Sequence, residues 1–221
     1  MYELLFLISN ITEFFPLIFL LKCDYSRYSE IFIPLLDFVI INPLILFISL
    51  LIVSLNYWEI TLNAFCQNIY TILYFFVISK IYRVLLVQLN NKVFEIGNII
   101  FLMVFLINCY WFDFRYEFFN YATSMVNLIF SIYGIIFFSV SERGINSGRF
   151  SNYFWLNIAL VTYNMCLFPA MLFDHFIIGK SWSFIPELLW SIVLIASILL
   201  NIVLSISFLQ VKNVREEVAK K

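Results

Sequence analysis

Seven long apolar runs, separated by short polar and charged segments, dominate the pattern of hydrophobic and polar positions along the chain. A helix needs about 20 apolar residues to cross the ~30 Å hydrocarbon core of a bilayer. Most of the runs reach that length, and the fourth is the shortest. We therefore predict seven transmembrane helices, near residues 4–21, 31–55, 60–79, 93–108, 118–140, 153–173 and 184–209.

The predicted fold class is an all-α membrane protein, a seven-helix transmembrane bundle over residues 1–210 followed by a short basic cytoplasmic tail at 211–221. Composition supports this class, because 63% of the residues are hydrophobic and only 12% are charged, whereas a soluble domain is about 45–50% apolar. The spans and their turns use nearly all of the 221 residues. No separate soluble domain is expected.

The placement of lysine and arginine predicts the orientation of the bundle. If the seven spans alternate, eleven of the thirteen basic residues fall on one side, and Arg115 and Lys180 fall on the other. Basic residues near span ends are retained in the cytoplasm. We therefore expect the N-terminus outside, the C-terminus in the cytoplasm, and a multi-pass location in the cell's inner (plasma) membrane.

Four of the predicted spans carry polar residues at helical spacing, so that each set shares one face. These polar stripes comprise Asn63, Gln67, Tyr70 and Tyr74, with Asn68 beside them, in the third span; Asn120, Ser124, Asn127 and Ser131 in the fifth; Tyr153, Asn157 and Asn164 in the sixth; and Glu187, Ser191, Asn201 and Ser205 in the seventh. Polar side chains that face lipid have no partners. The stripes are therefore expected to face one another inside the bundle.

Two carboxyl groups fall inside predicted spans, where a charge costs about 2.5–3.5 kcal/mol even on the most lenient scale. Glu13 lies near the middle of the first span, and Asp37 lies about two turns into the second. We expect no lysine or arginine at matching depth for either, a setting that favours the neutral acid. Each is then either a hydrogen-bonded structural acid or a site for proton coupling. Glu187 lies near a span end and is expected to be a solvated anchor that also begins a stripe.

The interior polar groups allow two interpretations. They form hydrogen bonds between helices, or they line a cavity, open to the outside, that holds a small ligand or passes a solute. Under the second interpretation the ligand or ion pathway comprises Glu13, Asp37, Asn63, Gln67, Asn68, Asn127, Asn164 and Glu187.

Several function classes are excluded by what the sequence lacks. The last span has no lysine for a retinal Schiff base, and His175 is the only histidine, too few for a zinc site or a histidine-based hydrolase. The four cysteines show no metal-binding or disulfide spacing. We therefore expect no enzyme activity, no catalytic residues, no metal, no cofactor and no nucleic-acid partner.

Short motifs in the third, sixth and seventh spans resemble uncharacterised seven-helix membrane proteins of Bacteroidota. The residues that carry the resemblance are Asn68-Ile69-Tyr70-Thr71, Phe154-Trp155 followed by Tyr163-Asn164, and Leu189-Trp190 followed by Asn201. Members of that family are often encoded near sensor kinases, so the resemblance implies a role in signalling. The family often has a histidine three residues after the last-span tryptophan, and Val193 stands in that place here.

The sequence thus leads to three functional hypotheses. The first is a small receptor-like or sensory membrane protein that signals through a cytoplasmic or membrane partner, because the chain has no output domain of its own. The alternative is a proton- or cation-coupled small-solute transporter or channel that uses Glu13 or Asp37. A second alternative is a structural membrane subunit, and in all three cases the lipid bilayer is a partner.

Overall fold

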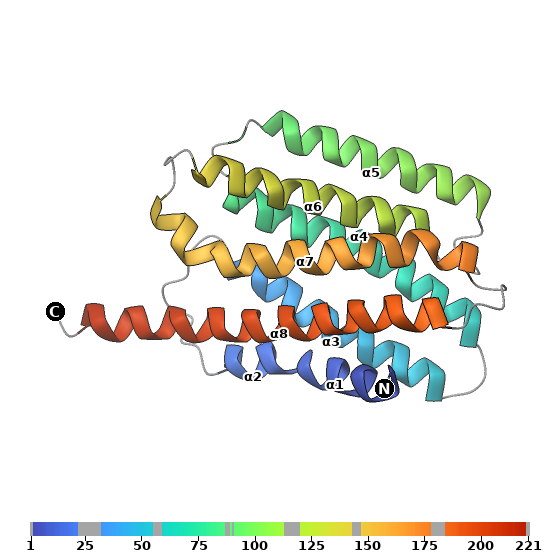
Figure 1. Ribbon diagram of the computed structural model, residues 1–221, viewed down its shortest axis with the longest axis horizontal. Helices are drawn as coiled ribbons and strands as arrows, with labels where there is room; N and C mark the ends of the chain where they lie inside the picture. The colour runs from blue at the N-terminus through green and yellow to red at the C-terminus, as the bar shows by residue number, and fades with distance from the viewer. Residues whose placement is uncertain are drawn as a thin grey trace.

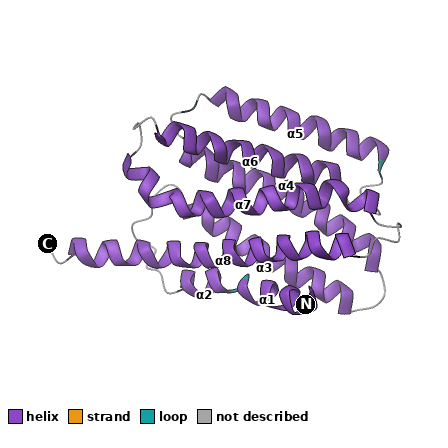
Figure 2. Ribbon diagram, in the orientation of Figure 1, coloured by secondary structure: helices purple, strands orange, loops and turns teal. Residues whose placement is uncertain are grey.

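The computed structural model describes residues 2–21, 32–54, 59–86, 89, 91–112, 120–142, 147–177 and 184–219. Nearly all of these residues are helical, and none of them forms a strand (Figure 2). The helices are α1 (Tyr2–Thr12), α2 (Phe15–Leu21), α3 (Phe32–Ser54), α4 (Glu59–Leu85), α5 (Asn91–Trp111), α6 (Asn120–Glu142), α7 (Ser147–Ile177) and α8 (Phe184–Ala219).

The helices form one bundle and alternate in direction along its long axis, with α1 and α2 together making one pass (Figure 1). The helix α6 packs against α5, α4 and α7, and α7 packs against α8. The pair α1 and α2 lies along α8, and α3 crosses against α4. Consequently α5 forms one edge of the bundle, and α1 and α2 form the opposite edge.

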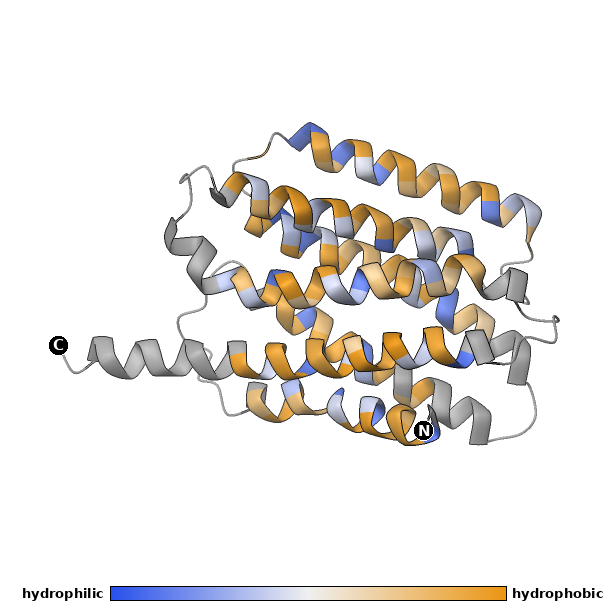
Figure 3. Cartoon of the chain, in the orientation of Figure 1, coloured by the Kyte–Doolittle hydropathy of each residue, from blue (hydrophilic) through white to orange (hydrophobic). Residues whose placement is uncertain are grey.

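Within the described ranges, five helices are long and apolar enough to cross a membrane. These spans are Ala64–Leu85, Asn91–Trp111, Asn120–Val140, Tyr153–Phe173 and Glu187–Ile206. Hydrophobic residues, orange in Figure 3, predominate along the helices. On the outer face of α5 the apolar side chains of Ile96, Met103 and Leu106 are exposed. The structure thus confirms an all-helical bundle with five helices that are long and apolar enough to cross a membrane, while seven crossings and their orientation remain predictions.

The first predicted span, 4–21, is two helices instead of one. Pro16 has no N–H to donate to the carbonyl of Thr12, and its ring crowds that carbonyl. The chain therefore leaves the α-helical pattern, and the N–H of Phe14 bonds the carbonyl of Ile11 at 3.2 Å, a tighter three-residue turn. Glu13 lies in this break between α1 and α2.

Several helices continue beyond the predicted ends of their spans. The helix α4 runs to Leu85, not to residue 79, and α8 runs to Ala219, so most of the predicted tail prolongs that helix. The last turns of α4 bury Ile81 and Tyr82 completely, and Arg83 lies 5.7 Å from the centre of the Phe94 ring. The predicted spans end at charged residues. A helix whose next turn is still buried continues past such a residue, and for this reason the predicted spans are too short.

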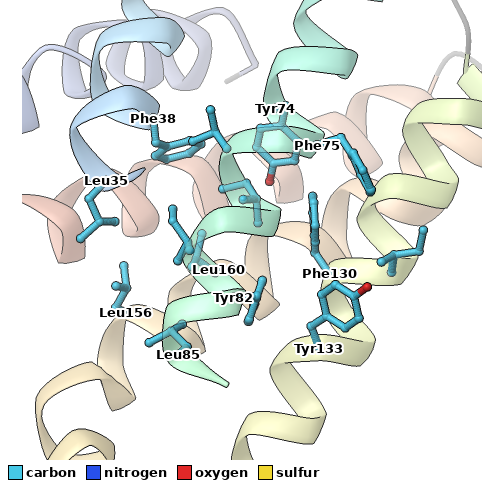
Figure 4. Packing of buried hydrophobic residues seen from close by; sticks show 14 of the residues in the cluster. Leu35, Phe38, Tyr74, Phe75, Tyr82, Leu85, Phe130, Tyr133, Leu156 and Leu160 are labelled. Atoms are coloured by element: carbon cyan, nitrogen blue, oxygen red, sulfur yellow. The ribbon is translucent and has the colours of Figure 1, made fainter. Parts of the chain in front are cut away.

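Aromatic side chains fill the main core, between α3, α4, α6 and α7 (Figure 4). The ring of Phe75 stacks on Phe101 of α5 at 4.0 Å between centroids and on Phe130 of α6 at 5.6 Å. Phe130 also meets the edge of the Tyr74 ring at 5.8 Å. Phenylalanine accounts for 27 residues and glycine for only five, so most helix contacts are made by large interlocking side chains.

Gly134 permits one close approach of helix backbones, between α6 and α7. A methyl group of Val161 lies directly over its Cα, in the space that a Cβ would need. At the same place the Asn157 amide on α7 donates a hydrogen bond of 3.1 Å to the Gly134 carbonyl. Small residues at such crossings let membrane helices pack by van der Waals contact.

Replacing Gly134 by alanine should therefore destabilise the bundle, because the new Cβ overlaps the Val161 methyl. Overpacking of this kind costs about 1–3 kcal/mol, and unfolding in mixed micelles would measure it. Val161→Ala should recover most of the loss in the double variant. A Gly134→Ala protein as stable as the wild type would contradict the close approach.

Candidate functional site

The break between α1 and α2 places a carboxyl group inside the bundle. Glu13 is half-buried, and its neighbour Thr12 is anchored on both sides. The Thr12 hydroxyl donates to the carbonyl of Ser9 at 2.8 Å and accepts the Asn201 amide of α8 at 3.4 Å. Pro16 has no N–H to donate to the carbonyl of Thr12. The Thr12 carbonyl oxygen, next to Glu13 in the chain, therefore lacks its usual helical hydrogen bond.

Two tyrosines from other helices approach Glu13. The hydroxyls of Tyr70 on α4 and Tyr163 on α7 lie within electrostatic reach of its carboxylate. Tyr74 follows one turn after Tyr70, with 5.6 Å between the ring centroids, and is also within electrostatic reach of Tyr163. We call Glu13, Tyr70, Tyr74 and Tyr163 the Glu13 site.

Hydrogen bonds to two asparagines orient the phenols of α4. The Tyr70 hydroxyl donates to Asn42 Oδ1 of α3 at 2.9 Å, and the Tyr74 hydroxyl donates to Asn164 Oδ1 of α7 at 3.0 Å. The Asn164 amide in turn donates to the carbonyl of Leu160 at 2.6 Å. Because both phenol protons are committed to amides, the phenol oxygens present lone pairs to their surroundings.

The Glu13 site is therefore rich in oxygen acceptors and poor in positive charge. Lys80 pairs with Asp37, and this ion pair does not include Glu13. A carboxylate with phenol oxygens and aromatic faces nearby suits a small cation or a ligand that donates hydrogen bonds. Among the described residues, no group of three histidines, cysteines or acids could hold a metal ion.

Asp37 does not belong to the Glu13 site, and the expectation that it lacks a basic partner was wrong. Lys80 Nζ lies 3.7 Å from Asp37 Oδ2, and the two side chains are 62% and 38% exposed. The error has a simple cause, since the third span was predicted to end at residue 79. The helix α4 continues to Leu85 and so carries Lys80 alongside α3.

The other predicted pathway residues do not gather at one place. Asn68 and Asn127 are completely buried in α4 and α6, where Thr71 and Thr123 join these helices through a hydroxyl pair at 2.9 Å. Gln67 is half-buried, and Glu187 is exposed at the start of α8. Asn63 lies within α4, but its side chain is outside the described residues. Among the predicted amides, Asn164 joins the Glu13 site through its hydrogen bond with Tyr74.

Sequence reasoning missed Tyr163 and Asn42 as members of this environment. Tyr163 directly precedes Asn164 and so falls beside the predicted stripe, on the neighbouring face of α7. Asn42 is the one amide of the second predicted span, and it directly precedes Pro43. A single amide in a span and an adjacent Tyr-Asn pair were the signals that could have identified them.

Comparisons of the chain with protein-family models, with curated proteins and with solved structures find no match. Function must therefore be argued from the residues and their arrangement.

Tyr74→Phe should destabilise the protein, because it leaves the Asn164 oxygen buried without its donor. Hydrogen bonds between membrane helices contribute about 0.6 kcal/mol on average and up to about 1.7 kcal/mol. We expect a value in the upper half of that range, since both groups are buried. A double-mutant cycle with Asn164→Ala would measure the coupling energy, and purely additive effects would contradict this bond.

Proposed function

We propose that the chain is a small receptor-like sensory membrane protein whose ligand-binding part is the Glu13 site. The observation that carries the proposal is a carboxyl group in the break of α1 and α2, within electrostatic reach of phenols of α4 and α7. Such a charge is costly at membrane depth unless it has a role or a partner. A ligand bound there would contact three separate parts of the bundle at once.

The chemistry of the site favours a small cation, either a protonated amine or a monovalent metal ion. Glu13 supplies the negative charge, and Tyr70 and Tyr163 supply neutral oxygens and ring faces. Divalent ions prefer six or more oxygen ligands, usually with several carboxylates, whereas Glu13 is the only acid of this site. A singly charged ligand matches a single carboxylate.

Transmission from the site would run through α8. The pair α1 and α2 packs along α8, and the bond from Asn201 to Thr12 joins α8 to the residue next to Glu13. A ligand can bias the bundle only as far as it binds two arrangements with different affinity. A shift of α1 and α2 on binding would therefore reach α8 and a signalling partner at its far end, in line with the role that the resemblance implies.

The direct test is a cation titration of the purified protein in lipid nanodiscs. The quantity measured at each cation concentration is the thermal unfolding temperature. Sodium, potassium and methylammonium would be compared at constant ionic strength. Binding stabilises by about 2.7 kcal/mol at a hundredfold excess over Kd, which corresponds to roughly 5–10 °C for a chain of this size. We expect a saturable rise with at least one of these cations.

Glu13→Gln should abolish that rise, because it removes the charge and keeps the shape of the side chain. Asp37→Asn is the matched control, since Asp37 pairs with Lys80 away from the Glu13 site, and its response should equal that of the wild type. A wild-type protein that responds to none of the three cations, or a response that survives in Glu13→Gln, would refute the proposal and leave the structural subunit as the better hypothesis.

The break itself favours a second candidate function, cation- or proton-coupled transport. Many transporters bind their coupling ions where a transmembrane helix is interrupted, and here the interruption coincides with Glu13. The distinguishing measurement is flux into liposomes that contain a pH- or cation-sensitive dye. Flux that is lost in Glu13→Gln would favour transport, whereas cation binding without flux would favour the sensor.

A further inference from the structure

A second polar region lies along α6. Asn120 Oδ1, Ser124 Oγ and Asn127 Oδ1 are buried atoms that make no hydrogen bond to any described residue. Their positions, i, i+4 and i+7, share one face of the helix. The same face continues through Ser131 to Gly134.

Two more unpaired atoms meet this face at Gly134. Tyr82 Oη of α4 and Asn157 Oδ1 of α7 are both buried and have no hydrogen-bond partner in the described part of the chain. A Cβ built on Gly134 would lie 3.0 Å from the first and 3.3 Å from the second. The row that begins at Asn120 therefore ends in the seam where α4, α6 and α7 meet.

The orientation of these amides is fixed by their other bonds. Asn127 Nδ2 donates to the carbonyl of Thr123 at 2.7 Å, and Asn157 Nδ2 donates to the carbonyl of Gly134 at 3.1 Å. Exchanging oxygen and nitrogen would break both bonds, so the unpaired atoms are the carbonyl oxygens. We call Asn120, Ser124, Asn127, Tyr82 and Asn157 the α6 polar row.

The unsatisfied hydrogen-bonding groups of the α6 polar row indicate what kind of ligand it can bind. The three amide oxygens require hydrogen-bond donors, while the hydroxyls of Ser124 and Tyr82 can donate as well as accept. No charged residue occurs between Asn120 and Ser141, so α6 itself offers no countercharge for an ion along the row. Water offers two donors and two acceptors, and buried waters typically bind such otherwise unpaired groups.

We propose that the α6 polar row binds a file of water molecules that extends into the hydrocarbon depth of the bundle. From Asn120 to Gly134 the row covers about 21 Å at 1.5 Å per residue, most of the ~30 Å apolar thickness of a bilayer. Polar groups at that depth are tolerated where they line water. The file gives the bundle a hydrated path along α6, and it does not depend on what the Glu13 site binds.

Water-edited solid-state NMR of the asparagine-labelled protein in lipid would test the file. Polarisation transferred from water should reach the side-chain amides of Asn127 and Asn157 rapidly, each assigned from a variant that lacks it. Asn164 is the matched internal control, because it is equally buried but its oxygen accepts the Tyr74 hydroxyl. Its build-up should be clearly slower.

Tyr82→Phe gives a second readout, since it removes one water ligand and retains the ring. The water signal at Asn157 should fall toward that of Asn164, while the signal at Asn127 stays. Equal build-up at all three asparagines in the wild type would overturn the proposal. Transfer to Asn127 and Asn157 from lipid protons, in place of water, would also overturn it, because a lipid group would then occupy the row.

Discussion

Polar groups inside a bilayer must find their partners within the protein, and every feature of this bundle depends on that constraint. Small polar side chains meet it most often by donating to the carbonyl one turn earlier on their own helix. Asn127, Ser131, Ser191 and Ser205 all do so, at 2.6 to 2.8 Å. Bonds between helices are fewer, and they gather where α3, α4, α6 and α7 meet.

The sites that stand out are the places where this local solution fails. At Pro16 the helical pattern itself is interrupted, and a carboxyl group lies at the break. Along α6 the amides use their nitrogens for the backbone, and their oxygens remain unpaired among the described residues. Stacked phenylalanine rings such as Phe75 and Phe101 raise no such conflict, because they need no hydrogen bonds. Buried polar groups with unused hydrogen-bonding capacity are therefore the best candidates for function in this bundle.

The sequence predicted the class of fold and the inward faces, and it singled out Glu13, but it did not predict which side chains surround Glu13. Apolar length and helical spacing are local properties, and so the burial of Asn127 and Asn164 could be expected from the stripes alone. The partner of Asp37 was missed because a charged residue was taken as the end of a helix that continues. The approach of Tyr163 to Glu13 depends on how α7 and the first pass both pack against α8, which no local pattern encodes.

The length of α8 gives the bundle a mechanical property. With 36 residues the helix is about 54 Å long, some 24 Å more than the ~30 Å needed to cross the hydrocarbon. It runs as one rod beside α1, α2 and α7 and extends past the rest of the bundle (Figure 1). Because a helix moves as a rod, a small tilt of the part of α8 that packs on α1, α2 and α7 becomes a larger sideways displacement at its far end.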